Sequence, residues 1–232
     1  MLLNKHYPLR SKFCKNIDYQ RPLETKSESK SENIYDIVKK SFIDQGLVFF
    51  GGLAHSLYSQ YMPKSLRQKL QKVPDFDVLS EDPYKSAIMV KERLGYENIK
   101  DVKIIKQPGL GEVIAPHYEI RIGNDTLAFI YKPLACHSYN VITVDSLKVK
   151  VATIDTMLSF YLAFLYSNRP YYDTERILCM SQFLFDVQQK NRLQQKGLLR
   201  RFSINCYGHQ ETLDSMREEK SKKFEELKNK KN

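Results

Sequence analysis

The stretch FFGGLAHSLYSQYMPKSLRQKLQKVPDFDVLS, residues 49 to 80, decides the predicted fold. A short apolar run ends in a Gly-Gly pair, and the segment that follows has apolar residues at helical spacing. After a basic loop, Asp75 and Asp77 stand on either side of Phe76. Side chains two residues apart on a strand point to the same face. We therefore expect the two carboxylates to project together while Phe76 packs on the other side.

Gly51 and Gly52 lie between the expected strand LVFF, residues 47–50, and the expected helix. Because glycine has no side chain, backbone N–H groups at a helix start can approach phosphates closely here. Asp75 and Asp77 can hold the divalent ions that neutralise a triphosphate and activate an attacking oxygen. Each signal alone also fits a turn or a strand edge. Their order, from strand to Gly-Gly, helix, loop and Asp-x-Asp strand, is typical of the nucleotidyltransferase fold.

The remaining pattern predicts an α+β fold, a mixed sheet with flanking helices and a helical C-terminal layer. We expect helices at 34–45, 83–94, 153–166, 173–195 and from about 210, and strands at 99–106, 112–122, 126–131, 141–144 and 147–151. Three regions follow: a basic N-terminal segment and linker at 1–32, a nucleotidyltransferase-like domain at 33–152 and a helical region at 153–232. The segment TIDTMLSFYLAFLY is apolar on almost every face, which predicts a buried helix.

Composition favours an intracellular protein with no membrane segment. The 232 residues contain no run of about 18 apolar residues, and the N-terminus lacks the features of a secretory signal. The four cysteines are far apart with no CxxC pair, which argues against a zinc site and fits a reducing compartment.

Basic residues are concentrated in two runs without acidic residues. The net charge is +10, and this excess suits a polyanionic partner such as RNA. The runs contain Lys64, Arg67, Lys69 and Lys72, and then Lys190, Arg192, Lys196, Arg200 and Arg201. A single run of this kind is usually a solvated face. Two runs, one of them beside the aspartate pair, favour contact with phosphates.

Long segments resemble the poly(A) polymerase catalytic subunit of large cytoplasmic DNA viruses, the poxvirus, asfarvirus and giant-virus type. They are LLNKHYPL, FFGGLAHSLYSQYM, VPDFDVLS, VATIDTMLSFYLAFLYSNRPYYD and QQKNRLQQKGLLRRFSINCYG. The resemblance implies transfer of AMP from ATP to RNA 3′ ends with Mg²⁺ or Mn²⁺, in viral mRNA polyadenylation. It also implies a place in the virion and host cytoplasm, and a cap methyltransferase subunit as a partner, as in the poxvirus relatives.

The chain departs from this family in two ways. The family's polymerases are longer, with two related halves, and everything from residue 33 onward resembles the second half. We therefore expect a fragment or one product of a split gene, with the catalytic N-terminal half or a second copy as partner. In addition, TLAFIY, the strand expected to carry a third carboxylate, contains no acid. Glu119 and Asp125 are the substitutes, although we expect Glu119 on a solvated face and Asp125 in a turn.

Two functions remain open from the sequence. In the first, the chain is an adenylyltransferase in which Gly51 and Gly52 bind the nucleotide, Asp75 and Asp77 bind the metal ions, and Glu119 or Asp125 completes the catalytic set. In the second, it is a non-catalytic half with a degenerate site that binds RNA or packs against another polymerase half. The second hypothesis depends on the basic run at 190–201 rather than on the aspartates.

Overall fold

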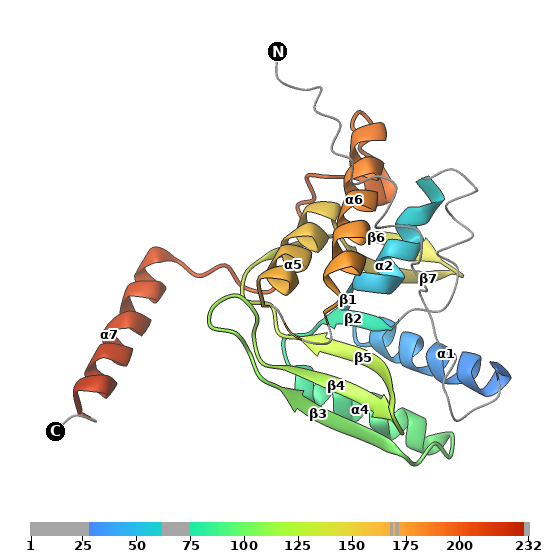
Figure 1. Ribbon diagram of the computed structural model, residues 1–232, viewed down its shortest axis with the longest axis horizontal. Helices are drawn as coiled ribbons and strands as arrows, with labels where there is room; N and C mark the ends of the chain where they lie inside the picture. The colour runs from blue at the N-terminus through green and yellow to red at the C-terminus, as the bar shows by residue number, and fades with distance from the viewer. Residues whose placement is uncertain (1–27, 62–74, 168, 170–171, 230–232) are drawn as a thin grey trace.

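The computed structural model describes residues 28–61, 75–167, 169 and 172–229 (Figure 1). Its strands are β1 (Val48–Phe50), β2 (Phe76–Leu79), β3 (Val102–Gln107), β4 (His117–Ile122), β5 (Asp125–Tyr131), β6 (His137–Val144), β7 (Leu147–Ala152) and β8 (Cys206–Tyr207). Its α-helices are α1 (Glu28–Asp44), α2 (Gly51–Tyr58), α4 (Pro83–Tyr96), α5 (Ile154–Ser167), α6 (Thr174–Lys190) and α7 (Leu213–Asn229). Two short 3₁₀ helices are η2 (Ser59–Tyr61) and η4 (Gly197–Leu199).

The strands form one mixed sheet in the order β3-β4-β5-β2-β1-β7-β6-β8. The two strands of the opening stretch, β1 and β2, are antiparallel neighbours in its middle. β1 also pairs in parallel with β7, and β2 pairs in parallel with β5. Helices α1 and α4 cover one face, and α2, α5 and α6 cover the other (Figure 1). The predicted α+β architecture, a mixed sheet with flanking helices, is therefore confirmed.

Aromatic residues on the central strands fill both layers of the core. Phe49 and Phe76 each contact Phe42 of α1 edge-on, with ring centroids 6.2 and 6.1 Å apart. The next residue of β1, Phe50, points the opposite way and stacks on Phe160 of α5 at 4.5 Å. This alternation is the pleat of a strand that is buried on both faces. It commits Phe76 to the α1 side, so its two aspartate neighbours face α2 and α6.

Helix α1 begins earlier than predicted. The segment KSESKSEN, expected to be a linker, lies largely within α1, which starts at Glu28 and runs through the expected boundary at residue 32. Ser31 is buried on the same helical face as Ile34, Tyr35 and Val38. A side chain as small as serine can be buried on this face. The polar residues of this segment therefore did not prevent helix formation.

Helix α5 is not buried on all sides, which corrects the prediction. Phe160 and Phe164 pack into the core, but Leu162 is 67% exposed and Tyr166 is 77% exposed. These two residues lie one turn apart, and no element of the described chain covers this face. Among the described residues, no helix has both the length and the apolar character to cross a membrane.

The short strand β8 was not predicted. It pairs with the start of β6, where His137 is in register with Tyr207. This pairing brings Cys136 and Cys206, 70 positions apart in the chain, into a disulfide with a Cα–Cα distance of 5.4 Å. We expected a reducing compartment because the cysteines are far apart in the sequence. Distance along the sequence does not show which cysteines the fold brings together, and here it brings Cys136 and Cys206 together.

Candidate functional site

A cavity of about 100 Å³ lies where β2 and β5 face α2, α5 and α6. Both predicted aspartates line it, together with a glycine of α2, side chains of β5, α5 and α6, and the turn before α6. The lining is Gly52, Asp75, Asp77, Phe129, Tyr131, Tyr161, Phe164, Tyr172, Asp173, Arg176, Ile177 and Met180. The structure thus brings the Gly-Gly turn and the Asp-x-Asp strand together, as the spacing in the sequence predicts.

The Gly-Gly turn fits closely against Asp77. Gly51 has φ of +60°, a left-handed conformation, and a Cβ built there would lie 2.6 Å from Asp77 Cγ. Only glycine satisfies both the backbone angle and this close approach. The backbone N–H of Gly52 donates a hydrogen bond to the Asp77 carboxylate. One of the amides that we expected to face phosphates therefore binds a side chain of the protein.

Burial in this cavity makes the aspartates hard to ionise. Burial raises the pKa of Asp77 to about 7, and the neighbouring Asp75 adds to the rise. Burial also raises the pKa of Asp75, with smaller upward contributions from Glu119 and Asp125. Arg176, from the first turn of α6, opposes both shifts because its positive charge favours the ionised carboxylates. A cation of the protein itself thus acts on the pair that was expected to bind metal ions.

The position beside Asp77 on the neighbouring strand is occupied by Phe129. The parallel pairing of β2 with β5 places Asp77 in register with Phe129, and paired residues share a face of the sheet. The resemblance to viral poly(A) polymerases led us to expect a third carboxylate on this strand, and a carboxylate at position 129 would share a face with Asp77. The sequence of this strand, TLAFIY, contains no acid, and the structure shows that Phe129 occupies the position beside Asp77.

Glu119 is buried, not solvated, so the predicted location was wrong. It is 1% exposed and is in register with Phe129 on β4, one strand further from Asp77. Its carboxylate accepts hydrogen bonds from Gln107 at 2.7 Å and Thr126 at 2.6 Å, and pairs with Arg121. Its oxygens are committed to the outer strands, because these donors lie on β3, β4 and β5. Asp125 begins β5 opposite Ile122, and neither acid lines the cavity.

These residues do not fit the pair of divalent ions that nucleotidyl transfer requires. Two ions need several oxygen ligands from the protein. Here two carboxylates share the cavity with the Arg176 side chain and the Phe129 ring. Across residues 28–61, 75–167 and 172–229, no group of three or more His, Cys, Asp or Glu side chains is placed to hold a metal ion.

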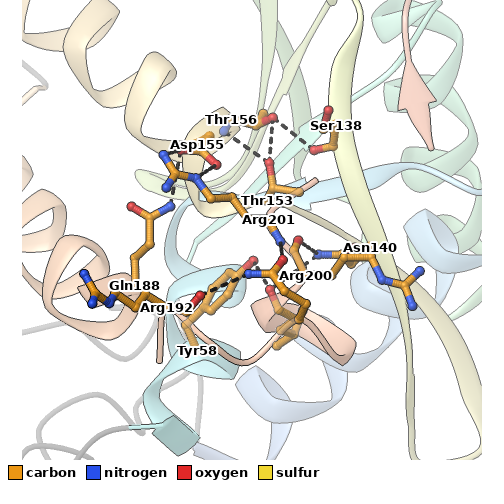
Figure 2. Close-up of polar contacts among 12 residues, drawn as sticks. Tyr58, Ser138, Asn140, Thr153, Asp155, Thr156, Gln188, Arg192, Arg200 and Arg201 are labelled. Carbon is orange, nitrogen blue, oxygen red and sulfur yellow. Dashed lines mark hydrogen bonds and ion pairs between the residues drawn. The ribbon is translucent and has the colours of Figure 1, made fainter. Parts of the chain in front are cut away.

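The second basic run forms an anchored surface segment, which we call the basic segment (residues 190–201). It begins at the last residue of α6 and continues through η4, and its five cationic side chains are all exposed. Figure 2 shows Arg201 turned toward Asp155 of α5, with an Nε–Oδ2 distance of 3.2 Å. Gln188 approaches the same carboxylate. The first basic run, Lys64, Arg67, Lys69 and Lys72, lies outside the described residues.

Hydrogen bonds to the main chain hold the basic segment on the sheet. The hydroxyl of Tyr58 lies 3.0 Å from the carbonyl oxygen of Ala152 and 3.2 Å from that of Leu198. The side-chain amide of Asn140 donates to the carbonyl of Arg200 at 2.8 Å (Figure 2). Two residues of the segment itself, Leu198 and Leu199, are buried. Its cations are therefore displayed on an ordered backbone.

The basic segment and the aspartate cavity lie at opposite ends of α6. Arg176 and Lys190 are separated by most of that helix, roughly 20 Å at 1.5 Å per residue. The sequence did not single out Arg176, because one arginine in the first turn of a helix is unremarkable until the fold places it against Asp75 and Asp77. Phe129 was likewise hidden, because strand order alone makes it the neighbour of Asp77.

No protein-family model and no curated protein sequence matches the chain. Solved structures do match it. The Megavirus polyadenylate synthase aligns with a TM-score of 0.65 at 12% identity, over 92% of this chain and 46% of that one. The antibiotic-resistance factor ANT(2″)-Ia in complex with adenylyl-2″-tobramycin aligns with a TM-score of 0.41 at 11% identity, over 71% of this chain and 92% of that one. An antigenic nucleotidyltransferase-like protein from Paracoccidioides brasiliensis aligns with a TM-score of 0.32 at 14% identity, over 75% of this chain and 93% of that one.

The first of these matches supports a nucleotidyltransferase-like fold for the chain. At this level of identity the likeness concerns the fold alone. The chain spans about half the length of the Megavirus protein.

Proposed function

We propose that this chain is the non-catalytic, nucleotidyltransferase-like half of a poly(A) polymerase. In this proposal the larger protein transfers AMP from ATP to RNA 3′ ends, and this half binds the RNA and packs against the catalytic half. The observation that carries the proposal is the register of Phe129 with Asp77. A phenyl ring stands where a metal-binding carboxylate is needed, while the rest of the nucleotidyltransferase corner keeps its shape.

The electrostatics of the cavity support the same reading. Nucleotidyl transfer needs ionised carboxylates that draw in divalent cations. Arg176 supplies the nearby positive charge that the site would otherwise draw from metal ions. The cavity, at about 100 Å³, is also small for a nucleotide.

The basic segment supports the role of RNA as ligand. Exposed arginine and lysine side chains on a fixed backbone contact phosphates without a large entropic cost, because the backbone is already ordered. Arg201 is partly neutralised by Asp155. Arg192 and Arg200 are exposed and form no ion pair with the described residues, so we assign them the main phosphate contacts.

An active adenylyltransferase is the second candidate. The observation in its favour is that Gly52, Asp75 and Asp77 meet at one cavity. For catalysis, Glu119 would have to serve as the third carboxylate. It lies two strands from Asp77, about 10 Å across the sheet, and its oxygens are already bonded to Gln107 and Thr126.

AMP incorporation into a short RNA primer separates the two candidates. The purified chain is assayed with ATP and Mg²⁺ or Mn²⁺, beside the variant Asp75→Ala/Asp77→Ala. We expect no incorporation by either protein. Incorporation that the double variant loses would overturn the proposal and establish the active enzyme.

RNA binding is measured in parallel as a function of salt. We expect Arg192→Ala/Arg200→Ala to weaken binding and to reduce the slope of log K against log salt by about 2, because two phosphate contacts are lost. The matched control is Lys103→Ala/Lys106→Ala, which removes two exposed cations from the edge strand β3. Equal losses in both variants would show that binding follows net charge and not the basic segment.

A further inference from the structure

An apolar groove lies on the outer side of α5, on the same face of the sheet as the aspartate cavity. Its volume is about 660 Å³, and it is bounded by α5 and the loops that precede β4 and follow β5. Four of its lining side chains are large, apolar and open to solvent: Leu162 at 67%, Tyr166 at 77%, Leu134 at 45% and Val113 at 42% exposed. A contiguous apolar surface of this kind marks an interaction site.

Helix α7 carries a complementary apolar stripe. Leu213, Met216, Phe224 and Leu227 fall on one side of this helix at helical spacing, and they are 72%, 39%, 71% and 61% exposed. None of its residues is buried, and α7 stands apart from the body of the protein (Figure 1). A helix of this length in water without a packing partner is marginally stable. We therefore expect the apolar stripe of α7 to pack against another surface.

The chain enters α7 from the rim of the groove. Tyr207 pairs with His137, which lines the groove. The next residue, Gly208, has φ of +95°, and a Cβ built there would lie 2.8 Å from Pro133 Cβ. The direction in which the chain leaves the sheet is thus fixed by a close contact that only glycine allows. From this exit the chain leads into α7, which stands apart from α5 (Figure 1).

We propose that α7 of one copy packs into the α5 groove of a second copy, and that the second copy returns the same contact. A two-fold pair of this kind covers both unpartnered features at once. An aromatic residue alone buries about 150–250 Å². Two helices that each insert four large apolar side chains reach the ~1,200 Å² at which stable interfaces begin. The stripe also contains Lys220, and the groove is lined by one acid, Glu112, and one base, Lys132, so apolar contact rather than charge accounts for the pairing.

This proposal does not rest on the proposed function, because neither RNA nor ATP enters it. Sedimentation equilibrium of the full chain measures the association directly. We expect a dimer whose Kd rises at least 10-fold in Phe224→Ser/Leu227→Ser and also in Leu162→Ser/Tyr166→Ser. All four side chains are exposed, so the fold does not depend on them. Ile204→Ser, at a residue 96% exposed outside both features, is the matched control and should leave the Kd unchanged.

Cross-linking identifies which copy supplies the helix. A photoreactive phenylalanine analogue replaces Phe224 in an affinity-tagged copy, which is mixed with an isotope-labelled copy of the unmodified chain. We expect cross-linked peptides that join the α7 of the tagged copy to residues 159–166 of the labelled copy. Cross-links only within the tagged copy would show that α7 folds back into its own groove and would overturn the proposal. A monomer at all concentrations, or a dimer that neither pair of substitutions weakens, would overturn it equally.

Discussion

Phe129 lies directly beside Asp77 on the adjacent parallel strand, on the same face of the sheet. Gly52 and both aspartates line the same cavity as Phe129, so the residue at position 129 determines whether a third carboxylate faces the aspartate pair. The relationship arises from strand order, since β5 follows β2 by some fifty positions in the chain but is next to it in the sheet.

Phe129→Asp should create a divalent cation site. Three carboxylates would then share one face, and cation binding would relieve their mutual repulsion. At a Mn²⁺ concentration ten times the Kd, the expected stabilisation is about 1.4 kcal/mol, or about 3–6 °C in Tm. Thermal unfolding with and without Mn²⁺ measures this shift.

Phe129→Asn is the control for this site. It loses the same ring but adds no charge, and its Tm should not respond to Mn²⁺. The same response in the aspartate and asparagine variants, or none in either, would show that position 129 does not determine cation binding.

Gly51→Ala should destabilise the protein far more than glycine-to-alanine changes usually do. The left-handed backbone costs about 1–2 kcal/mol for alanine, and the new Cβ would also overlap the Asp77 side chain. We expect a total loss of roughly 3–4 kcal/mol in the free energy of unfolding, measured by urea denaturation.

The matched control for Gly51 is Gly111→Ala. Gly111 has a similar φ of +50°, but no atom lies within 4 Å of a Cβ built there. Its loss in the free energy of unfolding should therefore be limited to the backbone cost, about 1–2 kcal/mol. If the two substitutions cost the same, the close approach of Gly51 to Asp77 has no energetic consequence.

The elements of this corner could be predicted from sequence, but their neighbours could not. Local spacing identifies a strand, a Gly-Gly turn, a helix and an Asp-x-Asp strand within one short stretch. Arg176 reaches the aspartates only because α6 packs across the sheet, about a hundred positions later in the chain. No local pattern records that contact.

Glu119 shows how a local pattern can mislead. Its strand, HYEIRI, alternates apolar and polar residues as a half-solvated strand does. The pairing of β4 with β3 and β5 instead supplies Gln107 and Thr126 as hydrogen-bond donors, so the carboxylate is buried with partners. The buried polar network is a property of three strands together, which is why one strand alone suggested a solvated face.

Asp77→Asn should stabilise the protein at high pH but not at low pH. Because the pKa of Asp77 is about 7 in the fold, against about 3.9 unfolded, the fold favours the protonated form. The stability from this group is present below pH 4 and is lost as pH rises to about 7. Asparagine resembles the protonated acid, so the variant should match the native chain near pH 4.5 and exceed it by about 1–3 kcal/mol at pH 8.5.

Urea unfolding of both proteins at the two pH values tests this difference. Asp145→Asn, a substitution in the exposed β6–β7 turn, serves as the matched control for the change of net charge. An advantage of Asp77→Asn that is equal at both pH values would contradict a raised pKa at Asp77.

Tyr58→Phe should loosen the basic segment without changing its charge. The tyrosine hydroxyl is fully buried between the carbonyl oxygens of Ala152 and Leu198, at 3.0 and 3.2 Å. Its loss leaves these acceptors without that donor and should lower the free energy of unfolding by about 1–2 kcal/mol. Native-state trypsin cleavage after Arg200 should accelerate by more than this global loss predicts, because the segment opens locally. Tyr166→Phe, at a residue 77% exposed, is the control and should change neither quantity. Unaltered cleavage in Tyr58→Phe would mean that η4 is held by the burial of Leu198 and Leu199 alone.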